Sequence, residues 1–73
     1  MYQLRDLEGL ECRVILLNGD NLIGSMSGQL SHHDDDRWVL DGQDVHIYIK
    51  ESCVKNIIKR EETAVLPSFF YCI

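Results

Sequence analysis

Several things are scarce in this sequence, and each shortage argues against a class of protein. Pro67 is the single proline, and the three cysteines, Cys12, Cys53 and Cys72, are widely separated. An odd number of cysteines without a Cys-x-x-Cys pair argues against a disulfide scaffold and against the common zinc motifs, so we expect free thiols and no metal. No apolar run is long enough to span a bilayer, and the first residues do not resemble a signal peptide. We therefore expect an intracellular, cytoplasmic protein without membrane contact.

Positive charge is also scarce. Seven Lys and Arg stand against twelve Asp and Glu in 73 residues, which gives a net charge of −5. A chain this acidic does not fit indiscriminate binding to nucleic acid. The cations are unevenly placed, however, because Lys50, Lys55, Lys59 and Arg60 fall within eleven residues. The sequence therefore predicts a local basic patch or, on the plainer reading, a solvated strand face whose lysines discourage edge pairing.

The residues that remain predict one small all-β domain over residues 1–73, with a core of about 4–60 and an apolar C-terminal tail at 61–73. Apolar residues and cysteine make up 45% of the chain, in short runs separated by turn residues at a spacing typical of β proteins. The spacing of Leu4, Leu7 and Leu10 predicts a short amphipathic helix near residues 2–9. We expect strands at 12–17, 22–30, 37–40, 45–50 and 54–58, with a hairpin turn at Asn18-Gly19. A core of this size is marginal, so a partner subunit is a natural stabiliser.

Two stretches of the chain resemble the Sm and Sm-like (LSm, Hfq-related) family. In the first, the glycines and apolar residues of the family's first motif are matched in register by Val14, Leu16, Gly19, Leu22, Gly24 and Met26. In the second, the second motif is matched by Ile49, Lys50, Val54 and Ile57. The resemblance covers about residues 4–60 and describes a divergent member. It implies a small five-stranded, SH3-like barrel with a short N-terminal helix.

The same resemblance implies a non-enzymatic, homo-oligomeric RNA-binding ring that needs no cofactor. In the family, the fourth strand of one subunit pairs with the fifth strand of the next, which here means residues 44–50 and 54–59. The oligomer or partner contacts would be Val45, Ile47, Ile49, Val54 and Ile57, together with Phe69, Phe70 and Tyr71 of the tail. The RNA-binding residues would be Lys50, Arg37, Asn18 and Lys55.

Some positions depart from the family and keep other functions open. Arg37 stands where the family has Asn, and Glu51 stands where it has Gly. With the net charge of −5, these departures favour an alternative function, an acidic Sm-like interaction or regulatory module that binds another protein rather than RNA. A structural subunit of a phage or bacterial assembly is a third reading. We do not expect an enzyme, because the chain shows no nucleophile, base and orienting group that belong together.

Three further features have two readings each. The run from His32 to Asp36 could bind a divalent metal, or it could form a solvated loop. Trp38 and Tyr48 could stack on bases, or they could pack inside a small barrel. The tail from Pro67 to Ile73 is too apolar to remain in water at no cost, so it packs either on its own barrel or on a partner.

Overall fold

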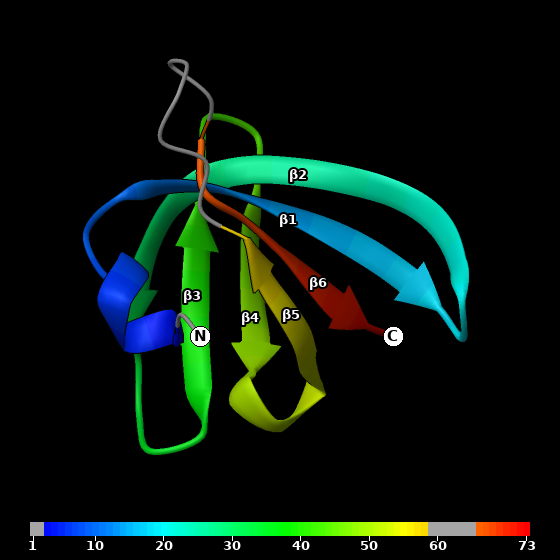
Figure 1. The fold of residues 1–73 in the computed structure, drawn as a ribbon. Coiled ribbons are helices and arrows are strands. Elements are labelled where there is room, and N and C mark those ends of the chain that lie inside the picture. The colour runs from blue at the N-terminus through cyan, green and yellow to red at the C-terminus, as the bar shows by residue number, and fades with distance from the viewer. Residues whose placement is uncertain (1–2, 59–65) are drawn as a thin grey trace.

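The computed structural model of the chain describes residues 3–58 and 66–73, and its elements are mostly strands. In chain order they are η1 (Leu4–Leu7), β1 (Glu11–Asn18), β2 (Asn21–His32), β3 (Arg37–Asp41), β4 (His46–Lys50), η2 (Glu51–Cys53), β5 (Val54–Ile58) and β6 (Ser68–Cys72). Over these residues the strands form one mixed six-stranded sheet in the order β4-β3-β2-β1-β6-β5. The sheet curves around one core without closing into a barrel (Figure 1). The all-β prediction is confirmed.

The β1–β2 hairpin forms at the predicted place, but its turn is Gly19-Asp20 rather than Asn18-Gly19. Asn18 pairs with Asn21, so the turn consists of two residues. Gly19, the first of these, has a φ of 63°, a left-handed value that glycine adopts without strain. β1 and β2 extend beyond the rest of the sheet, so the tip of the hairpin projects from the molecule (Figure 1).

The two glycines of β2, Gly24 and Gly28, have different surroundings. A Cβ atom on Gly28 would lie 2.7 Å from the backbone carbon of Asp41, so the absence of a side chain lets β2 pass close to the end of β3. A Cβ atom on Gly24 would have no neighbour within 4 Å. Gly28 is therefore required by packing, whereas the space at Gly24 is open.

The predicted N-terminal helix is a single turn of 3-10 helix. Leu4 and Leu7 are buried in the core, as their spacing predicts. Leu10 lies after the turn and is 41% exposed. Backbone hydrogen bonds from Gly9 N–H to the carbonyl of Leu30, and from Leu30 N–H to the carbonyl of Leu10, attach this segment to β2. A turn this short is held by its two buried leucines rather than by helix propensity.

The apolar tail packs on its own chain as β6. This strand lies between β1 and β5, parallel to β1 and antiparallel to β5. Phe69 is 0% exposed and belongs to the core, and Tyr71 packs against the core. Of the two readings of the tail, the described residues support contact with the same chain. The core consists of Leu4, Leu7, Cys12, Val14, Leu30, Trp38, Leu40, Ile49 and Phe69.

Candidate nucleic-acid and assembly surfaces

Two of the predicted RNA-binding residues lie side by side. Arg37 at the start of β3 pairs directly with Lys50 at the end of β4. Side chains directly opposite each other in an antiparallel pair are neighbours on one face, so both cations belong to the same surface. Two like charges in this arrangement repel each other, and a carboxylate beside one of them reduces that repulsion.

Asp34 supplies that carboxylate. Its Oδ2 accepts hydrogen bonds from Nε of Arg37 at 3.0 Å and from Nη2 at 2.7 Å. These bonds hold the pKa of the Asp34 carboxyl below its usual value, and the same contact raises the pKa of Arg37. Oδ1 of Asp34 also accepts the backbone N–H groups of Asp36 and Arg37, which fixes the β2–β3 turn. The guanidinium is thus already engaged by a carboxylate of its own turn.

An aromatic cluster lies on the same face as these cations. Tyr48 is two residues before Lys50 in β4, so its side chain is on the same side of the strand. Tyr48 is 51% exposed, and its ring centroid lies 4.9 Å from that of His33 and 5.5 Å from that of His46. Trp38 differs, because it is buried in the core, where its ring lies 4.7 Å from that of His32 at a tilt of 52°. Tyr48 is therefore available to a ligand, whereas Trp38 is a packing residue.

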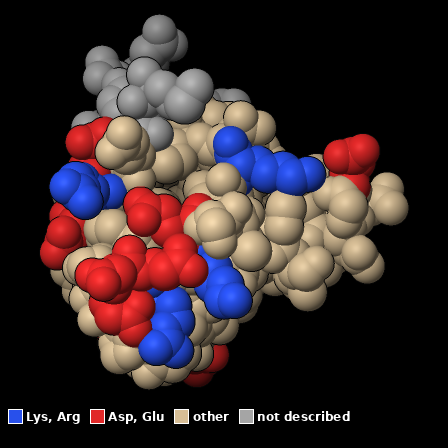
Figure 2. All heavy atoms as spheres, turned by 90° about the horizontal axis from the view of Figure 1, so that it is seen from below, with Lys and Arg blue, Asp and Glu red and all other residues tan. Residues whose placement is uncertain are grey.

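Acidic residues surround this end of the molecule. The run Asp34–Asp36 forms the β2–β3 turn, and the backbone N–H of Glu51 donates to the carbonyl of Asp36 at 2.8 Å, so η2 lies against that turn. Figure 2 looks onto this end, and acidic side chains gather there with Lys and Arg beside them. We call residues 34–36 and Glu51 the acidic end. The phosphates of a nucleic acid bound at Arg37 and Lys50 would have to approach this negative charge.

The other two predicted RNA-binding residues lie elsewhere. Asn18 is at the base of the projecting hairpin turn, and Lys55 in β5 directs its Nζ atom to within 3.9 Å of a carboxylate oxygen of Asp20 in that turn. Arg37 and Lys50 therefore form one pair, and Asn18 and Lys55 form a second group near the hairpin tip. Lys59 and Arg60, the remaining cations of the predicted basic patch, lie outside the described residues.

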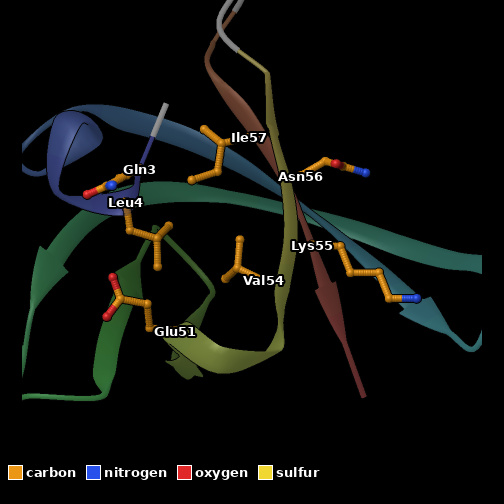
Figure 3. Close-up of a pocket in the computed structure, with 7 residues that line it drawn as sticks. All are labelled: Gln3, Leu4, Glu51, Val54, Lys55, Asn56 and Ile57. Carbon is orange, nitrogen blue, oxygen red and sulfur yellow. The ribbon is translucent and has the colours of Figure 1, made fainter. Parts of the chain in front are cut away.

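A small hollow lies on the inner side of β5. It has a volume of about 230 Å³ and is lined by Gln3, Leu4, Glu51, Val54, Lys55, Asn56 and Ile57. In Figure 3, Leu4, Val54 and Ile57 point into the hollow, whereas Lys55 and Asn56 point away from it. The hollow lies along one edge of the open sheet, and its floor is apolar. It is smaller than most cavities that enclose a small-molecule ligand.

The two strands expected to join neighbouring subunits are the two edges of the sheet. Among the described strands, β4 pairs only with β3, and β5 pairs only with β6. The outer backbone groups of both are therefore open to another strand. β5 has an irregularity between Val54 and Ile57, and such bulges shorten the stretch that can pair.

The apolar residues predicted as oligomer contacts serve mainly the core of this chain. Ile49 and Phe69 are buried in it, and the others that pack against it are Val45, Ile47, Val54, Ile57 and Tyr71. Phe70 is half-buried and stands on the opposite face of β6 from Phe69. Side chains on the edge strands can still border a neighbour, but the backbone edges rather than buried apolar groups would carry that contact.

The cysteines and the histidine-rich turn do not form a metal site in the part of the chain that the structure describes, where no three His, Cys, Asp or Glu residues are placed to hold an ion. All three thiols are free, and burial raises the pKa of Cys12 to about 11.

No helix of residues 3–58 and 66–73 is long and apolar enough to cross a membrane.

Comparison with protein-family models, curated proteins and solved structures gives no match to this chain. Function is therefore inferred from the geometry of the described residues. Two features went unpredicted. One is the position of β6 beside β1, which no local sequence pattern predicts. The other is the grouping of Tyr48 with His33 and His46, which the alternation of β4 could have indicated, because His46, Tyr48 and Lys50 share one face.

Proposed function

We propose that the chain is a non-enzymatic Sm-like module that assembles into a homo-oligomeric ring and binds RNA where Arg37 and Lys50 stand together. On this proposal, β1 to β5 correspond to the five strands of the Sm-like fold, and β6 is an addition, supplied by the tail, that lies between β1 and β5. The observation that carries the proposal is that β4 and β5 form the two edges of the sheet. These are the strands that the resemblance assigns to contacts between neighbouring subunits.

A ring is expected because the two edge strands, β4 and β5, are different surfaces of the chain. If β4 of one copy pairs with β5 of the next, the contact joins two different surfaces, and repeating it generates a closed ring when the rotation closes. Each junction would satisfy backbone groups that one chain leaves open. Because both edge strands have five residues and β5 is irregular, we expect junctions with few hydrogen bonds. Side-chain contacts along the edges would then contribute to their stability.

The RNA site rests on the adjacent cations and the exposed ring beside them. Arg37 and Lys50 would contact phosphates, and Tyr48 offers a face for an unpaired base. In a ring, one such group from each copy would repeat around the assembly. This repetition would give a weak individual site useful affinity for a longer single strand.

Titration with short U-rich and A-rich RNAs over a salt series tests this assignment. We expect Lys50→Ala to weaken binding and to reduce the slope of log K against log salt by about 0.7, the value for one lost phosphate contact with a single strand. Arg5→Ala is the matched control, because it removes one exposed cation from η1 and should leave the affinity nearly unchanged. Equal affinities for wild type and Lys50→Ala would remove Lys50 from the site.

Asp34→Asn tests the same site in the opposite direction. The substitution removes one negative charge and weakens the contact that engages the guanidinium of Arg37. We expect RNA affinity to rise, and we expect the gain to disappear in the double variant Asp34→Asn, Arg37→Ala. An affinity unchanged by Asp34→Asn would mean that Arg37 does not contact the RNA.

The acidic end favours the second candidate function, a module that binds the basic surface of another protein. Asp34 binds Arg37 directly within the turn, and the backbone of Glu51, the residue after Lys50, is bonded to Asp36 of the same turn. On this alternative, the cations would fix the turn rather than contact phosphate. Absence of binding to both RNAs, even at low salt, would overturn the RNA proposal and leave this alternative.

A further inference from the structure

The face of the projecting hairpin that points away from the core is apolar. β1 contains four consecutive apolar residues at positions 14–17, and neighbouring side chains of a strand point to opposite faces. Val14 is in the core and Leu16 packs against it, so Ile15 and Leu17 stand on the other face. Continuous apolar runs are typical of strands that are covered on both faces. Within the described residues, the sheet covers only one face of β1.

The neighbouring strands extend this apolar face. In the register of the sheet, Phe70 of β6 stands beside Ile15, and both Cys72 of β6 and Leu22 of β2 stand beside Leu17. We call these five residues the outer patch. Leu17 is buried, at 8% exposed, although it is not a member of the main core cluster. Leu22 is 68% exposed.

The outward face of the hairpin contains a groove. It has a volume of about 290 Å³ and is lined by Arg13, Ile15, Leu22, Gly24 and Ser25. Because Gly24 has no side chain and a Cβ there would meet nothing within 4 Å, the groove is open at its centre. An apolar side chain from a second surface can enter it without displacing backbone.

The charges along this face are arranged with opposite signs at its two ends. From the base of the hairpin to its tip, the outward positions of β1 are Arg13, Ile15 and Leu17, and the turn beyond them holds Asp20. The Asp20 side chain is fully exposed. A two-fold axis through the middle of the outer patch would reverse one copy against the other. Arg13 of each copy would then face Asp20 of the other, with the apolar residues between them.

We propose that the outer patch docks against the outer patch of a second copy of this chain, as two sheet faces packed together. Reversal of the charged ends makes the surface complementary to itself, which is what a two-fold contact requires. A face of five residues is small compared with the roughly 1,600 Å² of a standard interface, so the contact is weak and depends on concentration. It uses a sheet face rather than the β4 and β5 edges and is therefore independent of the proposed ring.

Sedimentation or light scattering over a concentration series tests the contact. The wild-type mass is expected to rise with concentration, and for the isolated chain it doubles from 8.5 to 17 kDa. Arg13→Asp and Asp20→Arg are each expected to raise the dissociation constant by at least about tenfold, because each places like charges opposite one another. The double variant with both substitutions restores the pairing with its sign reversed. It should bind more tightly than either single variant, with a remaining deficit because Asp20→Arg also places a second cation near Lys55.

Two controls separate this contact from loss of folding and from the ring. Arg5→Asp makes the same change of charge on η1 and should leave the doubling intact. Leu22→Ser should abolish the doubling, whereas Leu10→Ser, at an exposed leucine outside the outer patch, should not. Circular dichroism confirms that each variant is folded.

The proposal is overturned if the wild-type mass stays constant over the series. It is also overturned if the single charge reversals dissociate the pair but the double variant fails to restore it. A fixed mass of several subunits that none of these variants changes would overturn the docking while leaving the ring intact.

Discussion

Replacing Phe69 by alanine measures how far the tail strand contributes to the fold. Phe69 is 0% exposed and lies in the core between β1 and β5. Removal of a buried phenylalanine side chain costs about 3–5 kcal/mol through lost burial and the cavity that remains. A chain of 73 residues has a total stability of about 4–11 kcal/mol at the usual 0.05–0.15 kcal/mol per residue. We therefore expect Phe69→Ala to remove a large part of the free energy of unfolding, or to leave the chain unfolded.

Phe70 provides the matched control, because it is the next residue and faces away from the core. Urea unfolding followed by circular dichroism at low protein concentration compares the two alanine variants with wild type. Phe70 is half-buried, so we expect Phe70→Ala to cost less than about 1.5 kcal/mol. Equal losses for the two variants, or a loss below about 1 kcal/mol for Phe69→Ala, would refute the packing of β6 between β1 and β5.

Two further predictions concern packing and ionisation. Gly28→Ala should lower stability by about 1–3 kcal/mol because its Cβ would meet backbone at 2.7 Å, whereas Gly24→Ala should leave the urea midpoint nearly unchanged. With its pKa near 11, the buried thiol of Cys12 should resist Ellman's reagent at pH 8 in the folded chain, while Cys53, which is partly exposed, reacts. The folded state holds the Cys12 proton more tightly than the unfolded state, whose thiol titrates near 9. Stability should therefore fall as pH rises from about 9 to about 11, and more steeply in wild type than in Cys12→Ala.

The strands and the hairpin could be predicted from the sequence because their signals are local. The expected strand at 54–58 has the observed bounds, and the hairpin turn lies one residue further on than the Asn18-Gly19 pair, at Gly19-Asp20. The position of β6 could not be predicted in this way. Hydrophobicity showed that the tail must be buried, but the choice of β1 as a parallel neighbour depends on pairing between residues more than fifty positions apart.

The sequence predicts which residues belong to the candidate site better than it predicts how they are arranged in space. Arg37 and Lys50 were expected to act together, and the register of β3 and β4 brings them together. Asn18 and Lys55 were expected at the same site, but they lie near the projecting hairpin because β1 and β2 extend beyond the other strands. The contact between Arg37 and Asp34 depends on the conformation of the β2–β3 turn, which composition does not determine.

The most direct test of the proposed assembly is the absolute mass of the wild-type chain in solution, measured by light scattering. The proposed ring should give a discrete multiple of 8.5 kDa, such as five, six or seven subunits, that persists on dilution. A mass of 8.5 kDa at every concentration would contradict the ring. The edges of β4 and β5 would then be unpaired in solution, and the RNA site at Arg37 and Lys50 would lose the repetition that its affinity requires.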